Sequence, residues 1–300
     1  MSSIVAEAEA RTQTYVPRID PALCLTSTSL APLASAIAPF QQIVGKVRDI
    51  YVFEDRVLLV STDRQSAFDR ALASVPFKGR VLTMTSAWWF DATRHIVPNH
   101  VLSSPHASAM LCKKCTVFPV EFVVRGYITG STSTSMWTNY AKGSRDFCGH
   151  KLQDGYVQHQ KLPQNLVTPT TKDDTHDELI SGEEVVRSGR MTQQQWDYCA
   201  QKALELFAFG QQQAAQRGLI LAGLSPENID KEFLRLWFKD HCDPYNDAVL
   251  PEAPKELVLE LSRRYILLYE LITGNKFEFP ATSDVHQELL DSLRGPLTQH

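Results

Sequence analysis

The feature that most constrains the fold is a change of pattern along the chain, from strand-like runs in the first half to helix-like stripes in the second. Residues 47–53 and 56–62 are rich in β-branched and aromatic residues, and the Glu54-Asp55 pair between them is typical of a hairpin loop. Further strands are predicted over residues 112–118 and 121–129. This segregation of strands and helices indicates the α+β class.

The helical signals are clearest in two places. Thr192 and Gln195 match a capping box, and apolar residues then recur at helical spacing as far as Phe207. A later helix is predicted over residues 255–273, with Gly274 placed to end it in a left-handed cap.

Two segments are less regular. Residues 219–222 (LILA) are a candidate for a short buried strand, and a helix is predicted to open at Ser225-Pro226. The first 24 residues show no clear period, and we expect residues 1–24 to form a loose extension.

Charge and composition narrow the class of protein. The 300 residues carry 30 Lys+Arg and 34 Asp+Glu, which argues against the basic face that nucleic-acid binding needs. No apolar run approaches the roughly 18–20 residues of a membrane helix. The N-terminus fits neither a secretory signal nor a transit peptide, and six cysteines are too sparse for a disulfide scaffold. We therefore expect a cytoplasmic globular protein of enzyme size.

Residues 45–51 (GKVRDIY) place a glycine and two cations at the mouth of the predicted hairpin. Lys46 and Arg48 are two positions apart, so in a strand they point to the same face. Two cations beside a glycine turn suit a chain of phosphates, and the alternative is a solvated strand face. The spacing of a nucleotide P-loop is absent from the sequence.

Two polar segments are candidates for substrate binding. Residues 61–70 (STDRQSAFDR) directly follow a predicted strand, and polar ligands often bind where strands end. Residues 168–178 (TPTTKDDTHDE) suit an acidic or zwitterionic substrate, with Lys172 on a carboxylate and Asp177 on an amine. The alternatives are an ordinary capped turn for the first segment, and a solvated acidic loop or Mg²⁺ ligands for the second.

Arg125 lies inside an apolar strand, where a guanidinium is costly to bury unless an anion pairs with it. The Gly130-Ser131 step that follows offers backbone N–H groups and a hydroxyl. Together they suit a monophosphate. The alternative is an ion pair between Arg125 and a structural carboxylate such as Glu121.

Several of these segments resemble one family. The resemblance covers roughly residues 25–280, in the right order. Residues 229–238 (IDKEFLRLWF) and 262–274 (SRRYILLYELITG) fit its longer form. The segments that resemble phosphoribosylaminoimidazole-succinocarboxamide synthase, or SAICAR synthetase, most clearly are residues 45–51 (GKVRDIY), 61–69 (STDRQSAFD), 119–131 (PVEFVVRGYITGS) and 168–178 (TPTTKDDTHDE).

The resemblance implies an ATP-dependent ligase of purine biosynthesis. Such an enzyme joins L-aspartate to the carboxylate of carboxyaminoimidazole ribotide and releases SAICAR, ADP and phosphate, with Mg²⁺ neutralising charge during phosphoryl transfer. It also implies a two-lobed fold with the ATP cleft between the lobes. We expect a nucleotide-binding lobe over residues 25–118 and a substrate-binding and helical lobe over residues 119–300.

The resemblance also implies roles for individual residues. Those expected at ATP are Lys46 and Arg48 at the phosphates, Lys114 and Val117 at adenine, and Glu121 near the nucleotide. Those expected in substrate binding are Asp63, Arg64, Ser66, Arg125, Ser131 and His176, with Arg125 and Ser131 on the ribotide phosphate. Lys172 and Asp177 are the expected catalytic residues.

The chain departs from the family pattern at one point. In the family, the strand that matches residues 219–222 is normally followed by an acidic residue, a Lys-x-Glu-Phe-Gly stretch and further carboxylates expected to hold Mg²⁺. This chain passes from Ala222 directly to Gly223, so that block is missing and the metal ligands stay unknown. The alternatives are a catalytically impaired or non-catalytic homologue that binds ribotide or nucleotide, and a spliced or mis-assembled form of the active enzyme.

Overall fold

The computed structural model describes residues 3–68, 70–172, 178–218 and 231–298. The chain forms two compact units: Met1–Cys115 with Glu227–His300, and Thr116–Pro226. The predicted boundary at residue 118 lies close to the observed one. The prediction that residues 119–300 form a single lobe is wrong, because the chain returns to the first unit after residue 226.

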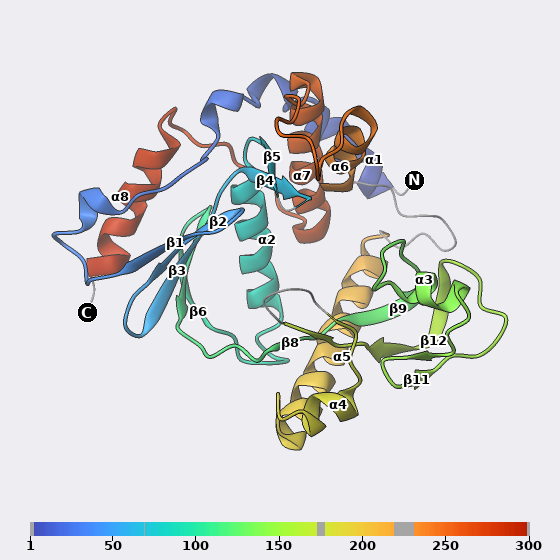
Figure 1. Ribbon diagram of the computed structural model, residues 1–300. Coiled ribbons are helices and arrows are strands. Elements are labelled where there is room, and N and C mark those ends of the chain that lie inside the picture. Colours follow the sequence, from blue (N-terminus) through green and yellow to red (C-terminus); the bar gives the residue numbers. More distant parts are fainter. Residues whose placement is uncertain (1–2, 69, 173–177, 219–230, 299–300) are drawn as a thin grey trace. The chain divides into compact units, whose positions relative to one another are not determined.

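Within the described residues, the first unit is built on a five-stranded antiparallel sheet in the order β1-β2-β3-β7-β6 (Figure 1). The predicted hairpin is confirmed, because β2 pairs with β3 from Arg48↔Ser61 to Val52↔Val57. The strand predicted over residues 112–118 ends early, at Lys113. The strands are β1 (Gln41–Val44), β2 (Arg48–Val52), β3 (Arg56–Ser61), β6 (Val101–His106) and β7 (Ala109–Lys113).

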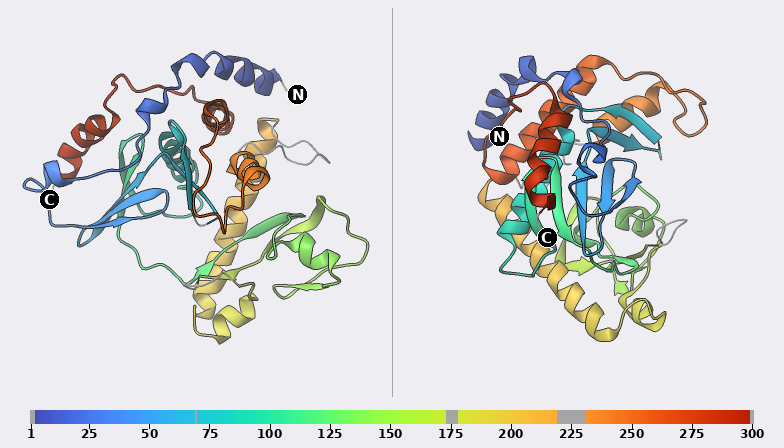
Figure 2. Two further views of the ribbon diagram at one scale, coloured as in Figure 1. Left: turned by 45° about the horizontal axis from the view of Figure 1, so that its top comes forward. Right: turned by 90° about the vertical axis from the view of Figure 1, so that its left-hand side faces the viewer.

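Alternation along the strands gives this sheet two apolar faces. Tyr51, Leu58 and Leu111 stand in one row across β2, β3 and β7, and all three are buried. Helix α8 (Val285–Thr298) covers that face, and α2 (Lys78–Ala92) lies on the opposite face (Figures 1 and 2). The leucines that α8 contributes to the core are Leu289, Leu290, Leu293 and Leu297.

A second core joins α2 to the C-terminal helices. Helix α7 (Lys255–Thr273) confirms the predicted helix, and Gly274 caps it in the left-handed region at φ 76°. Leu261 and Ile266 of α7 and Phe238 of α6 (Lys231–His241) are fully buried in this cluster. These contacts explain why the residues after 226 belong to the first unit.

The N-terminal segment is not a loose extension, and that prediction is wrong. Helix α1 (Ser3–Gln13) packs on α7, where the Arg11 guanidinium meets Glu270 at 2.8 Å and Arg263 meets Glu9 at 2.8 Å. The sequence pattern does not reveal this packing, because the residues that pair with α1 lie some 250 positions further along the chain. The short elements that complete the unit are η1 (Val16–Arg18), η2 (Pro21–Leu23), η3 (Ala31–Leu33), β4 (Arg64–Ala67) and β5 (Arg70–Ser74).

In the described part of the second unit, the longest strand pair is antiparallel. Strand β9 (Val124–Ile128) pairs with β12 (Gln160–Val167), and the shorter pairs are β8 (Val120–Glu121) with β13 (Thr170–Thr171) and β10 (Asp146–Phe147) with β11 (His150–Lys151). Its core gathers Ile128, Met136 and Leu162. The helices are α3 (Met136–Ala141), α4 (Gly182–Arg187) and α5 (Gln193–Gln216).

Helix α5 begins at the predicted capping box: the Thr192 hydroxyl accepts the Gln195 N–H at 3.2 Å, and the Gln195 side chain accepts the Thr192 N–H at 2.9 Å. Its apolar stripe, however, is only half-covered. None of the 24 described residues of α5 is fully buried. The strand predicted over residues 219–222 and the helix start at residue 226 lie outside the described residues.

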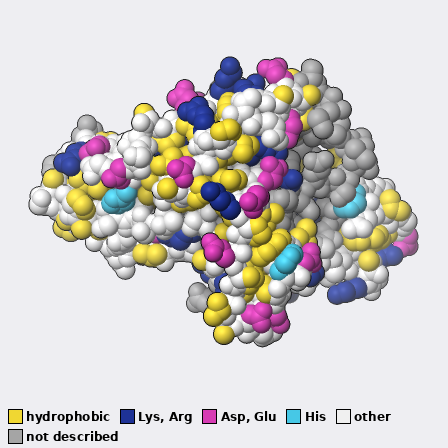
Figure 3. All heavy atoms as spheres, turned by 90° about the horizontal axis from the view of Figure 1, so that it is seen from above, with side chains coloured by type: hydrophobic (Ala, Val, Ile, Leu, Met, Phe, Trp, Pro, Cys, Tyr) yellow, Lys and Arg dark blue, Asp and Glu magenta, His cyan; other side chains and the backbone are white. Residues whose placement is uncertain are grey.

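The surface mixes charges of both signs. On the face drawn in Figure 3, Lys and Arg side chains are interspersed with Asp and Glu side chains, in keeping with the formal net charge of −4. In the described ranges, no helix combines the length and apolar character that crossing a membrane requires.

Candidate functional site

Lys46 and Arg48 extend from the turn that joins β1 to β2, and both are exposed. Val44 pairs with Asp49 across this turn, and the Gly45 N–H donates to the Arg48 carbonyl at 2.8 Å. A Cβ at Gly45 would lie 3.1 Å from that carbonyl oxygen, which is tighter than usual. The two cations predicted to meet phosphates thus stand on a tight, exposed hairpin turn.

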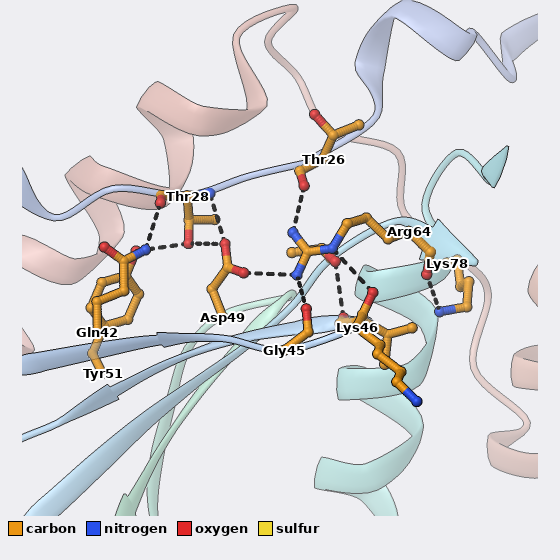
Figure 4. A network of polar contacts seen from close by, with 11 residues as sticks. Thr26, Thr28, Gln42, Gly45, Lys46, Asp49, Tyr51, Arg64 and Lys78 are labelled. Carbon is orange, nitrogen blue, oxygen red and sulfur yellow. Dashed lines mark hydrogen bonds and ion pairs between the residues drawn. The ribbon is translucent and has the colours of Figure 1, made fainter. Parts of the chain in front are cut away.

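Arg64, at the start of β4, points into the protein at the base of this turn (Figure 4). Its guanidinium has five N–H donors. Most of them are engaged with the protein, so the structure places Arg64 in the framework of the turn rather than toward a ligand. The acceptors are the carbonyls of Thr26 (2.6 Å), Gly45 (2.9 Å) and Lys46 (3.2 Å) and the Asp49 carboxylate (2.7 Å).

Asp63 anchors the end of β3 to the start of α2. Its buried carboxylate accepts the N–H groups of Leu25 at 2.8 Å and Gly79 at 2.7 Å. Burial raises the pKa of Asp63 to about 6, against the opposing effect of these N–H donors. A Cβ at Gly79 would lie 2.3 Å from the Ser61 carbonyl oxygen, so this approach requires glycine. Asp63, predicted to line the substrate cleft, therefore faces the protein interior.

Lys78, the first residue of α2, is a site neighbour that sequence reasoning missed. Its side chain is buried, and its Nζ donates to the Arg64 carbonyl at 2.9 Å. Burial lowers the pKa of Lys78 to about 8. Lysine is rarely buried, so the one clue in the sequence is its place before Gly79 at a helix start.

Ser66 and Lys114 complete the predicted set in the first unit. Ser66 is half-buried on β4, opposite Ala71 of β5. Lys114 is exposed just after β7, and its N–H donates to the Asp55 carbonyl at 2.9 Å, while its Nζ lies 3.4 Å from the Phe53 carbonyl. These contacts hold Lys114 beside the β2–β3 turn.

In the second unit, Arg125 is half-buried on β9. Its Nε donates to the Thr168 hydroxyl at 3.0 Å and its Nη2 to the Thr134 carbonyl at 3.3 Å, and the guanidinium lies 5.5 Å from the Phe147 ring centre. Burial lowers the pKa of Arg125. The predicted alternative, an ion pair with Glu121, is wrong, and Arg125 forms no ion pair with any residue in the described ranges.

The loop after β9 brings Ser131 into the same neighbourhood. Gly130 has φ +104°, and a Cβ there would lie 2.4 Å from the Ser135 Cβ, so the loop depends on glycine. The Ser135 hydroxyl donates to the Thr132 carbonyl at 2.8 Å and fixes the loop's far end. Ser131 is exposed. The Arg125 contact with this loop gives a half-buried cation beside an exposed, glycine-shaped turn.

Glu121 and Lys172 face one another across the β8–β13 pair. The Lys172 Nζ lies 4.0 Å from the Glu121 carboxylate, and both side chains are about half exposed. Val117, predicted to contact adenine, is 82% exposed. His176 and Asp177 lie outside the described residues, so the aspartate part of the predicted site has no structural description beyond Lys172.

Among the residues that the structure describes, no three or more His, Cys, Asp or Glu side chains gather in a group that could hold a metal ion.

Comparisons with known proteins point to one family. The SAICAR synthetase family model matches residues 41–224. The chain is 49% identical to the chloroplastic phosphoribosylaminoimidazole-succinocarboxamide synthase of Arabidopsis thaliana, over 89% of this chain and 74% of that protein. It is 48% identical to the corresponding synthase of Legionella pneumophila (strain Lens), over 90% of this chain and 98% of that protein.

Solved structures show the same fold. The SAICAR synthase of Saccharomyces cerevisiae, solved in complex with SAICAR, matches with a TM-score of 0.71 at 26% identity, over 85% of this chain and all of that chain. A SAICAR synthetase solved in complex with ADP matches with a TM-score of 0.57 at 19% identity, over 80% of this chain and all of that one. The second likeness shows the fold alone.

The sequence matches also contain positions that this chain lacks. The Legionella match extends over 313 positions but takes in 90% of 300 residues, about 270, so about 43 positions have no residue here. The Arabidopsis match extends over 307 positions and takes in 89%, about 267 residues, which leaves about 40. The match to the family model ends at residue 224.

Proposed function

This chain belongs to the SAICAR synthetase family of ligases in purine biosynthesis, and we propose that it joins L-aspartate to carboxyaminoimidazole ribotide at the expense of ATP. The function follows from the family. The substrates, the nucleotide and the residue roles are our assignments from the geometry of each unit.

The observation that carries the proposal is the Arg125 guanidinium. It is half-buried and meets no carboxylate among the described residues. A cation in such a place calls for an anion, and the adjacent Gly130-Ser131 turn offers N–H groups and a hydroxyl that a phosphate accepts well. We assign Arg125 and Ser131 to the phosphate of the ribotide.

The nucleotide is assigned to other residues. Lys46 and Arg48 stand on the exposed β1–β2 turn and are assigned to the ATP phosphates, with Lys114, Val117 and Glu121 toward the adenine nucleoside. Mg²⁺ is proposed to enter with the nucleotide, and it supplies neutralisation of phosphate charge when bound.

The proposed chemistry balances in two steps. A carboxylate oxygen of the ribotide takes the γ-phosphoryl group of ATP, and ADP leaves. The amine of L-aspartate then bonds to the activated carbonyl carbon, phosphate leaves with that oxygen, and the amine loses a proton. We assign Lys172 to a carboxylate of L-aspartate, Asp177 to its amine, and His176 to the same substrate region.

The experiment pairs binding with turnover. Calorimetry of Arg125→Ala with the ribotide is expected to show at least about a tenfold weaker affinity than the unchanged chain, since a charge-assisted contact to phosphate is lost. Arg187→Ala is the matched control, because Arg187 is exposed on α4 and pairs with Glu184 at the surface at 2.8 Å. Equal ribotide affinity in Arg125→Ala and the unchanged chain would refute the assignment.

A second candidate, a binding homologue without full catalysis, is favoured by the positions that this chain lacks. We propose that the roughly 40 unmatched positions form one block after Ala222. Two observations support this: the family-model match ends at residue 224, and α5 has an apolar stripe but no fully buried residue in its described length. A segment that packs on α5 would complete its burial.

Two measurements separate these candidates. Sequencing the transcript and the genomic DNA across the Ala222–Gly223 junction shows whether the gene encodes a block there. Inserting the corresponding Legionella segment at that junction is expected to raise ATP-dependent turnover above that of the chain as given, while ribotide affinity changes little. Full turnover by the chain without the insert would end the binding-homologue candidate.

We also propose a cytoplasmic location, on composition alone. The Arabidopsis relative is named chloroplastic, so a plastid is the alternative. Imaging of the native gene product in its own cells distinguishes the two.

A further inference from the structure

The β1–β2 turn is held by its carbonyl groups. The backbone carbonyls of the four turn residues, 45–48, each accept a hydrogen bond from within the protein. The donors are Arg64 Nη2 to Gly45 (2.9 Å), Arg64 Nε to Lys46 (3.2 Å), Thr62 N and Oγ1 to Val47 (3.0 and 2.9 Å) and Gly45 N to Arg48 (2.8 Å). The Arg64 side chain therefore donates to two of these four carbonyls, those of Gly45 and Lys46.

Arg64 is itself fixed from behind. Its Nη2 meets the Asp49 carboxylate at 2.7 Å, and the Asp49 side chain is 1% exposed. The other carboxylate oxygen accepts the N–H and the hydroxyl of Thr28, each at 2.8 Å. Arg64 Nη1 donates to the Thr26 carbonyl at 2.6 Å. Figure 4 shows these contacts converging on one guanidinium, which ties the segment before β1 to the turn.

The geometry requires an arginine. A planar guanidinium directs several N–H groups at fixed angles and so reaches three separate segments at once, whereas a lysine ammonium is a compact charge on a flexible stem. The ion pair is also largely sheltered from water, with Arg64 16% exposed. A lysine at position 64 would keep the positive charge beside Asp49 but could not donate to the Thr26, Gly45 and Lys46 carbonyls at the same time.

We propose that Arg64 and Asp49 form a positioning pair, which holds the 45–48 turn so that Lys46 and Arg48 are presented ready for the phosphates of a nucleotide. This inference rests on the proposed ATP-binding role of the turn. Arg64 acts through Lys46 and Arg48 and does not itself bind the ligand. A turn ordered in advance binds without first having to be ordered by the ligand, which favours affinity.

The test has a ligand-free arm and a ligand arm. In the ligand-free protein, Arg64→Lys is expected to speed hydrogen exchange of the Gly45 and Thr62 amides by about tenfold or more, because these amides donate to the Arg48 and Val47 carbonyls and local opening of the turn becomes easier. In calorimetry, the same variant is expected to weaken ATP binding by about tenfold, while ribotide affinity stays unchanged. Asp49→Asn is expected to act in the same direction.

The matched control is Arg80→Lys. Arg80 lies in the same unit and pairs with Glu288 at 2.8 Å, with 11% of its side chain exposed, but it has no contact with the turn. It is expected to lower stability without changing exchange of the Gly45 and Thr62 amides or ATP affinity. This split separates positioning of the turn from a general loss of stability.

Three results decide the matter. Unchanged exchange and unchanged ATP affinity in folded Arg64→Lys overturn the inference. Equal effects of Arg80→Lys and Arg64→Lys on ATP affinity overturn it as well. If the unchanged protein binds the ribotide but not ATP, that result refutes the nucleotide assignment of the proposed function. Faster exchange in Arg64→Lys would then still support the positioning of the turn by Arg64.

Discussion

Glu270 of α7 offers the sharpest test of how the N-terminal segment is held. Its side chain is 0% exposed and accepts three hydrogen bonds, from the Arg11 guanidinium (2.8 Å), the Tyr15 hydroxyl (3.0 Å) and the Phe277 N–H (2.9 Å). The bond to Glu270 also raises the pKa of Arg11 above its ordinary value. A neutral Glu270→Gln variant keeps the shape of the side chain but places an amide NH₂ against these donors.

The expected cost follows from these contacts. Breaking a buried ion pair by changing one partner costs about 3–5 kcal/mol. The lower end applies here, about 3 kcal/mol, because Arg11 is 26% exposed and can regain water. The glutamine carbonyl can still accept from Tyr15 or Phe277. A domain is stable by about 5–15 kcal/mol, so the loss is a large share of the total.

The assay is urea unfolding of the full chain, followed by tryptophan fluorescence. Glu7→Gln is the control, because Glu7 meets Arg11 at the exposed surface and such pairs contribute less than about 1 kcal/mol. Arg11→Met combined with Glu270→Gln completes a double-mutant cycle. A Glu270→Gln variant within about 0.5 kcal/mol of the unchanged chain, or no coupling in the cycle, would refute the reasoning.

Three further predictions concern the site. Gly130→Ala is expected to cost about 1–3 kcal/mol and to weaken ribotide binding, whereas Gly143→Ala pays only for its positive φ because nothing lies near its added Cβ; thermal unfolding and calorimetry check both. Gly79→Ala is expected to be more damaging than either, because its Cβ would meet backbone at 2.3 Å; circular dichroism and urea unfolding measure this. Burial raises the pKa of Asp63 from 3.8 to about 6, so the folded state takes up a proton first as pH falls. The free energy of unfolding should therefore rise by about 2 kcal/mol between pH 6 and pH 4 relative to Asp63→Asn, and paired urea titrations at those pH values would contradict this if the difference stayed constant.

Local patterns predicted the elements whose signals are local. The β2–β3 hairpin is confirmed, and so is α7, which ends at Gly274 in the left-handed backbone conformation that favours glycine. The capping box of α5 is confirmed in both directions. Each of these depends on residues within a few positions of one another, and the sequence displays those directly.

Interactions between distant residues were beyond the same reasoning. The N-terminal segment looked loose because its order depends on Glu270 and Arg263, far along the chain. Arg64 lies in the polar segment of residues 61–70, for which the sequence pattern predicted substrate binding. Only the fold shows that its guanidinium turns toward Thr26, Gly45 and Asp49. The sequence alone does not distinguish a polar side chain that binds the ligand from one that supports the ligand-binding turn.

The proposed missing block would bear unequally on the two units. In the first, α7 buries a long series of side chains, including Leu261 and Ile266, between α1, α2 and α6. In the second, the 24 described residues of α5 include none that is fully buried. The block of about 40 positions proposed to be missing after Ala222 would cover α5, whereas the β1–β2 turn and the Arg125 contacts are formed without it. Binding of nucleotide and ribotide is therefore expected to survive in this chain more completely than turnover, and comparing ribotide affinity with turnover before and after insertion of the Legionella segment measures that difference directly.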